Sequence, residues 1–483
     1  MHALILLPLL LACSPTKVGG TDPTDGGGTD GGGSDGGGSD GGGSDGGGSD
    51  GGSADGGAPI EGLVLEVDTQ IVTMLHASWP ASEASLSFIE YRFEGEDWLV
   101  APAVSPTSAV ILGIPERTTV EARLVEVNGG EEARSDIQSE ETGALPADLL
   151  LPIVDAWEPE LADAAPYAMI SLASGDRYTF EGPYQVLIFD RQGRIVWYDE
   201  TPAGMITFYP SVALDGTHIW AEASDIFGFG GDSPHAVRRT LDGRWTQRTE
   251  LAELGQAVGE GPDGSFFYER RSSRGVALMQ IDADGTVSTI WDCAAWMSAE
   301  GIGSSNCYMN ATNWTERHNS VLTSMFYSNT VFEIDLGTGQ PVRQMGQLTV
   351  GEPYSFSPVR STFDYQHFPN YTDEGTLLVS THEPGVSGRQ FAAEYTVDDS
   401  SRTLTRGWYY QSTDTWATQL GEALRLRNGN TIQGYGQDGA VREVTPDGEE
   451  AWFVRWEKDG QGYRAIGHLS LIDDLYALNR GPE

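Results

Sequence analysis

Between Pro59 and about Leu145, apolar and polar residues alternate over short stretches of the chain. Clear cases are "LVLEVD", "LSFIEYRFE" and "TVEARLVEV", and polar turns separate them. Alternation with a period of two is typical of strands that bury one face. Roughly seven such stretches in this segment predict a small β-sandwich over residues 59–145.

The rest of the chain, residues 146–483, carries a recurring hairpin signal. Turn glycines, mostly preceded by Asp or Asn, stand between alternating apolar stretches at Gly193, Gly216, Gly243, Gly264, Gly285, Gly339, Gly375, Gly429, Gly439 and Gly448. The first five are separated by 23, 27, 21 and 21 residues. Two hairpins per unit give a repeat of about 45 residues, the size of a four-stranded propeller blade. We therefore expect an all-β chain whose larger part is a β-propeller of six or seven blades, with a second set of sandwiches as the alternative.

The first residues predict export. "MHALILLPLLLAC" has an apolar run of the length of a signal peptide, too short to span a bilayer. Its end, Leu11-Ala12-Cys13, resembles a bacterial lipobox, so residues 1–13 are predicted to be a lipoprotein signal with Cys13 lipidated. A plain secretory signal is the alternative. Ser14 after the cysteine favours the outer membrane, with the protein facing the periplasm or the cell surface, and the lipid is expected to be the sole membrane attachment.

Residues 14–58 are dominated by repeated Gly-Gly-Gly-Ser-Asp units. They offer almost nothing to bury, so we expect a disordered, flexible tether.

The net charge narrows the classes of molecule that the protein can bind. The net charge of -43 argues against binding to nucleic acid or to anionic lipid surfaces.

With Cys13 used for lipid, Cys293 and Cys307 remain, and an oxidising compartment favours a disulfide between them. Two buried free thiols are the other possibility.

Two regions resemble known families. Trp79, "IEYRFEGEDW" and "LGIPERTTVEARLVEV" occur in the order of a fibronectin type III domain, with Val120 where that family often has tyrosine. Three later segments resemble bacterial aryl-sulfate sulfotransferases: "NCYMNATNWTERHNSVLTSMFYSNTVFEIDLGTGQPVRQMG", "FDYQHFPNYTDEGTLLVSTHE" and "GEALRLRNGNTIQGYGQDGAVREVTPDGEEAWFVRW". The second resemblance implies six blades, a site in the central channel, and sulfuryl transfer from an aryl sulfate to a phenolic acceptor, without a nucleotide donor or a cofactor.

The resemblance also implies roles for individual residues. His367 stands at the position of the nucleophilic histidine, which takes up the sulfuryl group, and Asn310 at that of an asparagine that contacts the sulfuryl oxygens. Tyr308 replaces the histidine of the family's His-x-Asn pair, and its hydroxyl can still donate a hydrogen bond. The family's arginine is absent after Ser324, so Arg360 or Arg271 is expected to supply the cation that the developing negative charge requires.

The alternatives are structural. A lone histidine before a strand is commonly a hydrogen-bonded or surface residue, and a propeller that has lost its arginine is consistent with a binding or interaction module at the cell surface.

The other histidines have no metal-ligand spacing, so no metal site is expected. Aromatic residues near His367 suit stacking on phenolic substrates and equally suit blade packing. The enzyme hypothesis requires His367, Asn310, Tyr308 and an arginine to surround one channel.

Overall fold

The computed structural model describes residues 60–175, 184–225, 231–384, 388–457 and 463–482. The predicted signal with Cys13, and the tether over residues 14–58, lie outside the described residues. Within the described ranges, no helix combines the length and the apolar character that crossing a bilayer requires.

A sandwich precedes the propeller. Its strands are β1 (Val64–Val67), β2 (Leu75–Ser78), β3 (Leu86–Phe93), β4 (Leu99–Ser105), β5 (Ser108–Ile111), β6 (Thr119–Asn128), β7 (Glu131–Arg134) and β8 (Gln138–Glu141). They pair in the order β1-β2-β5-β4-β3-β6-β7, and β8 also pairs with β6. The alternating apolar positions of β2, β3, β5 and β6 meet in one core, which includes Trp79, Ile89 and Val120. The period-two pattern thus reports a buried face on each of these strands, while the fibronectin type III assignment stays a prediction.

The later strands form a six-bladed β-propeller, as predicted. From the channel outward, the blades contain the following strands. Blade 1 has β34 (Tyr463–Ile472), β10 (Tyr167–Gly175), β11 (Tyr184–Asp190) and β12 (Ile195–Glu200). Blade 2 has β13 (Ser211–Val212), β14 (Ile219–Ala223), β15 (His235–Arg239) and β16 (Thr246–Glu250). Blade 3 has β17 (Leu254–Glu260), β18 (Phe266–Ser272), β19 (Gly275–Ile281) and β20 (Val287–Trp291).

Blades 4 to 6 continue the pattern, and the last two have a fifth strand. Blade 4 has β21 (Met309–Thr315), β22 (Ser320–Met325), β23 (Thr330–Asp335) and β24 (Gln340–Gly346). Blade 5 has β26 (His367–Tyr371), β27 (Leu377–His382), β28 (Gln390–Asp398), β29 (Thr403–Gln411) and β25 (Ser355–Ser357). Blade 6 has β30 (Glu422–Arg425), β31 (Thr431–Gly434), β32 (Ala440–Val444), β33 (Glu450–Trp456) and β9 (Pro152–Trp157).

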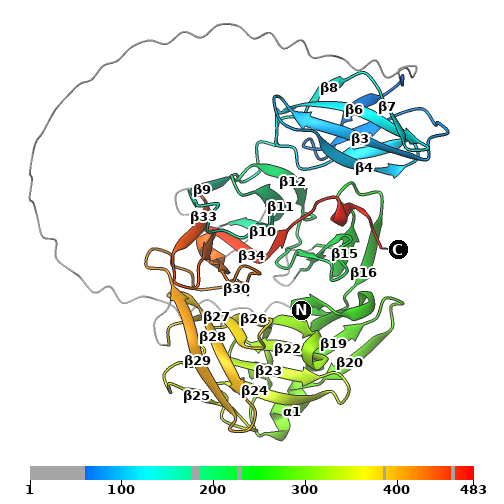
Figure 1. Ribbon diagram of the computed structural model, residues 1–483. Coiled ribbons are helices and arrows are strands. Elements are labelled where there is room, and N and C mark those ends of the chain that lie inside the picture. The colour runs from blue at the N-terminus through cyan, green and yellow to red at the C-terminus, as the bar shows by residue number, and fades with distance from the viewer. Residues whose placement is uncertain (1–59, 176–183, 226–230, 385–387, 458–462, 483) are drawn as a thin grey trace, which may run out of the picture. The chain divides into compact units, whose positions relative to one another are not determined.

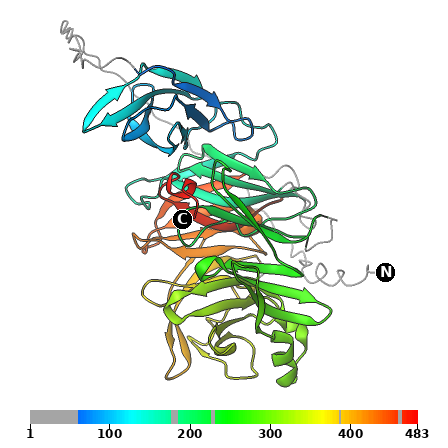
Figure 2. The ribbon, with the colours of Figure 1, turned by 90° about the vertical axis from the view of Figure 1, so that its right-hand side faces the viewer.

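Both ends of the propeller segment help to close the ring. The C-terminal strand β34 pairs with β10, placing Leu469 opposite Ile170, and becomes the inner strand of blade 1. At the other end, β9 pairs with β33, placing Trp157 opposite Trp452 at the outer edge of blade 6. Figure 1 shows β34 in red beside β10, and Figure 2 shows the red strand again among the early blades. Closure leaves fewer unpaired strand edges open to other chains.

The glycine turns that suggested the repeat adopt the backbone that hairpins require. All ten predicted turn glycines have positive φ, for example 82° at Gly193 and 90° at Gly429. Residues with a Cβ rarely adopt these angles. Glycine therefore allows the tight turn that joins one strand of a hairpin to the next.

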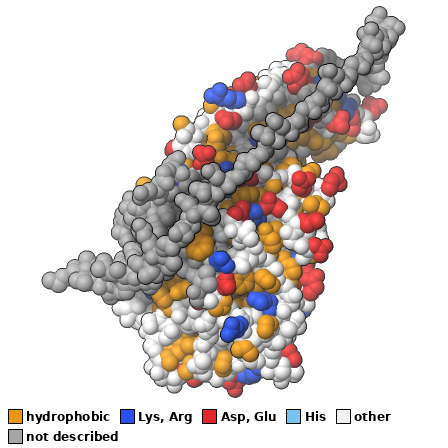
Figure 3. Space-filling view, turned by 90° about the vertical axis from the view of Figure 1, so that its left-hand side faces the viewer, with side chains coloured by type: hydrophobic (Ala, Val, Ile, Leu, Met, Phe, Trp, Pro, Cys, Tyr) orange, Lys and Arg blue, Asp and Glu red, His pale blue; other side chains and the backbone are white. Residues whose placement is uncertain are grey.

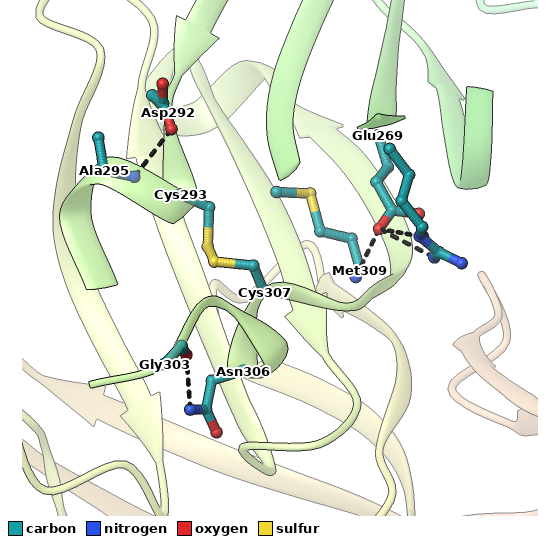
Figure 4. The surroundings of a disulfide bond; sticks show 9 residues. Glu269, Asp292, Cys293, Ala295, Gly303, Asn306, Cys307 and Met309 are labelled. Atoms are coloured by element: carbon teal, nitrogen blue, oxygen red, sulfur yellow. Dashed lines mark hydrogen bonds and ion pairs between the residues drawn. A yellow bond between two sulfur atoms is a disulfide. The ribbon is translucent and has the colours of Figure 1, made fainter. Parts of the chain in front are cut away.

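The helices of the described chain are short. They are α1 (Cys293–Ala299) and single turns at Pro262–Gly264, Ser304–Cys307, Glu316–His318, Gly436–Asp438 and Ala477–Asn479. Asp292 caps α1 by accepting a hydrogen bond from the Ala295 N–H at 2.9 Å. Cys293 and Cys307 form the expected disulfide, so the free-thiol alternative is wrong (Figure 4).

On the face drawn in Figure 3, acidic side chains are not gathered in one patch, and basic side chains lie among them. This distribution is consistent with a role of the negative charge in solubility.

Candidate active site

His367 and Asn310 start neighbouring inner strands. His367 is the first residue of β26 in blade 5, and Asn310 is the second residue of β21 in blade 4. The Asn310 side-chain amide donates a hydrogen bond of 2.9 Å to the carbonyl oxygen of Gln366. The structure therefore brings these two sequence-predicted residues together at the N-terminal ends of the inner strands.

The imidazole of His367 is buried and neutral. The residue is only 3% exposed, and its Nδ1 has no hydrogen-bond partner. Burial, assisted by the neighbouring His382, lowers the pKa of His367 to about 3. At neutral pH the ring therefore has an available lone pair and need not lose a proton before it attacks an electrophile.

Other buried polar atoms close to His367 also have no partner. Ser380 lies opposite His367 in the sheet, and the Gln390 amide donates a hydrogen bond of 3.1 Å to the Ser380 hydroxyl. Gln390 Oε1, His382 Nε2 and Asn310 Oδ1 have no hydrogen-bond partner. Buried polar atoms without partners are uncommon in folded proteins, so their concentration here marks a candidate site.

Ser380 and Gln390 were not predicted as site residues from the sequence. Both residues reach His367 through the pairing of β26, β27 and β28, and pairing partners cannot be read from the segment around one histidine. His382 ends the apolar strand β27, two positions after Ser380 and therefore on the same face of the strand.

Tyr308 lies just before β21, where blades 3 and 4 meet. Its hydroxyl donates a hydrogen bond of 2.9 Å to Gln256 Oε1, and the guanidinium carbon of Arg271 lies 3.9 Å from its ring centroid. Arg271 pairs with the buried Glu269 at 2.7 Å. Glu269 also accepts the N–H of Met309 at 3.2 Å, as Figure 4 shows. The predicted cation Arg271 is thus beside Tyr308, with its charge neutralised by a carboxylate that the sequence analysis did not single out.

One signal pointed to this ion pair. Glu269 and Arg271 are two residues apart in β18, so their side chains leave the same face of the strand. The pairing places a positive and a negative charge together between two blades.

Arg360 lies elsewhere. It is exposed in a turn three residues after β25, the added strand that pairs with the outermost strand β29. The next residue, Ser361, accepts a hydrogen bond from Tyr395 of β28 at 2.8 Å. This position is on the outer half of blade 5, so the structure does not bring Arg360 to His367, which is in the innermost strand.

Aromatic rings form a continuous run from Tyr308 to His382. The ring centroids of Tyr308 and Tyr327 are 5.3 Å apart, and those of Phe326 and Tyr327 are also 5.3 Å apart. Phe326 then contacts Tyr365 at 5.2 Å, and Tyr365 contacts His382 at 5.9 Å. Tyr327 and Tyr365 are 45% and 38% exposed. The run therefore joins solvent-accessible rings to the buried surroundings of His367.

No metal centre is found in the described part of the chain. It contains no group of three or more His, Cys, Asp or Glu side chains arranged to hold an ion.

The buried His382 should make the fold sensitive to acid. Burial lowers its pKa to about 4, whereas an unfolded histidine titrates near pH 6.5. Between these values the unfolded chain binds the proton more tightly, so the free energy of unfolding falls by about 1.4 kcal/mol per pH unit as the pH decreases. Between pH 7.5 and pH 5, we expect His382 to account for about 2 kcal/mol of lost stability.

Urea denaturation of the wild type and of His382→Gln at both pH values tests this expectation. The loss on acidification should be about 2 kcal/mol smaller in the variant. Any packing cost of the substitution appears at both pH values and cancels. Equal losses in the two proteins would show that this imidazole does not titrate as its burial implies.

Comparison with known proteins gives no family. No family model matches the chain, and no curated protein matches it. Solved structures that resemble it include one titled as a nidogen/laminin complex, with TM-score 0.38 and 9% identity, covering 63% of this chain and 97% of that one. A putative 6-phosphogluconolactonase from Bacteroides fragilis has TM-score 0.35 and 10% identity, with coverages of 78% and 100%. A DUF4784 family protein from Bacteroides caccae has TM-score 0.33 and 9% identity, with coverages of 81% and 95%. At these scores, none of the likenesses carries an argument about function.

Proposed function

We propose that this protein transfers a sulfuryl group from an aryl sulfate to a phenolic acceptor through His367. The observation that carries the proposal is the neutral, buried imidazole at the start of an inner strand, with Nδ1 unpaired. The sequence resemblance adds a reaction in which a histidine of this kind is the nucleophile.

The reaction has two displacements at sulfur. In the first, an imidazole lone pair forms an N–S bond while the aryl O–S bond breaks, and the departing phenolate takes a proton from water. In the second, the oxygen of the acceptor phenol attacks the same sulfur and releases its proton to solvent. The N–S bond then breaks and leaves the neutral histidine.

Negative charge on the sulfuryl oxygens and the departing phenolate needs donors in the transition state. Asn310, in the neighbouring inner strand, has a side-chain amide next to the backbone of Gln366. One N–H of this amide has no acceptor among the described residues. Tyr308 and Arg271 supply a hydroxyl and a cation at the same end of the channel. The aromatic run from Tyr308 to His382 offers stacking surfaces to the donor and acceptor rings.

A second function is favoured by the same contacts. The Tyr308 hydroxyl already donates to Gln256, Arg271 is neutralised by Glu269, and no arginine in the described ranges donates a hydrogen bond to His367. If this arrangement persists when a ligand enters, the propeller binds small aromatic molecules at the cell surface without transferring sulfate.

A chromogenic aryl sulfate separates the two functions. With a phenolic acceptor and no nucleotide, the purified protein should release the coloured phenol at a rate that depends on the acceptor. Mixed with the aryl sulfate alone, the intact protein should gain the mass of one SO₃ group. If the aryl sulfate binds saturably but gives neither phenol nor adduct, the binding function holds and the transferase is excluded.

A further inference from the structure

The central channel contains a cavity further along the inner strands than His367. Its volume is about 220 Å³, and the inner strand of every blade, or the residues just before it, contributes to the wall. Its lining includes Tyr209, Trp220, Trp314, Phe368, Glu422 and His468. Because Phe368 directly follows His367 and lines this cavity, it stands between the two parts of the channel.

The cavity wall is acidic. Glu260 and Glu422 line it and are 7% and 2% exposed at their side chains, and no lysine or arginine is among the lining residues. Glu260 is neutralised by Arg238 at 3.3 Å. Glu422 Oε2 accepts the N–H of Leu469 at 2.9 Å and lies 2.9 Å from His468 Nδ1. No lysine or arginine among the lining residues forms an ion pair with Glu422.

Aromatic rings form much of the remaining wall. Tyr209, Trp220, Trp314 and Phe368 come from blades 2, 4 and 5. The Tyr209 and Phe368 centroids are 5.3 Å apart, and those of Phe368 and His468 are 5.1 Å apart. Aromatic faces beside a buried carboxylate attract ammonium ions, because the ring quadrupole and the charge act in the same direction.

The cavity also offers hydrogen bonds to a polar group. The side-chain amides of Asn313 and Asn370 donate to the carbonyl oxygens of Pro369 and Ala423, each at 2.8 Å. Their side-chain oxygens therefore remain as acceptors on the wall.

We propose that this cavity binds a small alkylammonium ion that carries a hydroxyl group. The ammonium would lie against the rings and Glu422, and the hydroxyl would donate to the side-chain oxygen of Asn313 or Asn370. This site is separate from the sulfuryl-transfer proposal, since none of its ligand contacts involves His367, Asn310 or Tyr308.

Choline and its uncharged isostere 3,3-dimethylbutan-1-ol test the proposal, because they have the same shape and hydroxyl group and differ in charge. In calorimetric titrations of the full chain, choline should bind saturably and at least tenfold more tightly than the isostere. Glu422→Gln should weaken choline binding at least tenfold and leave binding of the isostere unchanged. The amide oxygen of glutamine can still accept the Leu469 N–H, so the substitution removes the charge with little change in shape.

Two further variants complete the test. Glu374→Gln removes a carboxylate from the exposed turn before β27 and should leave choline affinity unchanged. Ser305→Ala, at another exposed position, should also leave it unchanged. Choline is titrated without an aryl sulfate, so a failed transferase does not affect this result. Absence of saturable choline binding, or equal affinity for choline and the isostere, overturns the proposal; this comparison needs only the wild type, even if Glu422→Gln does not fold.

Discussion

Replacing His367 by alanine is expected to abolish acceptor-dependent release of phenol from an aryl sulfate. The imidazole is the group that forms the covalent bond to sulfur in the proposed reaction. Removal of a catalytic nucleophile lowers kcat by at least about a thousandfold. The SO₃ adduct seen in intact-protein mass spectra should disappear with the activity.

The matched control is His235→Ala. His235 is also buried, at 4% exposure, but it belongs to β15 in blade 2, and its Nδ1 lies 2.7 Å from the carbonyl oxygen of Ser233. This variant should transfer sulfate at the wild-type rate. The urea concentrations at which the two variants unfold distinguish a loss of activity from a loss of folded structure. A His367→Ala protein that is folded and still releases phenol would exclude His367 as the nucleophile.

Removing the disulfide is expected to lower the free energy of unfolding by about 3 kcal/mol, the value for a closed loop of about 15 residues. The cross-link joins Cys293 and Cys307, which are 14 residues apart, and so restricts the unfolded chain. Cys307 directly precedes Tyr308, so the loop also fixes the approach to β21. The measurement is urea denaturation of the Cys293→Ser, Cys307→Ser double variant.

Ser305→Ala is the control, because it changes an exposed side chain within the same loop and leaves the cross-link in place. Its unfolding free energy should equal that of the wild type. Reduction of the wild type should reproduce the loss seen in the double variant. If the double variant unfolds at the wild-type urea concentration, the loop contributes nothing to stability.

The candidate site was predictable only in part. The segment around His367 indicated a histidine before a strand, whereas in the structure His367 itself begins the inner strand β26, with Asn310 beside it. Tyr308 and Arg271 are also in contact, although the partner that neutralises the arginine, Glu269, was not foreseen. Arg360 was a plausible cation from its distance along the chain, but the segment between β25 and β26 crosses the blade and leaves this residue outside.

By itself, the sequence determined the local features of this protein: the alternating strands, the glycine turns with positive φ, and two cysteines close enough along the chain to pair. These features depend on residues that are neighbours in sequence, so local sterics and hydrophobic periodicity are sufficient to predict them. Only the tertiary structure decided that β34 closes blade 1 against β10, that Asn310 of blade 4 donates to Gln366 of blade 5, and that Glu422 and His468 meet in one cavity. Such contacts join residues far apart along the chain, and they are selected by the packing of six blades around one axis rather than by any local preference.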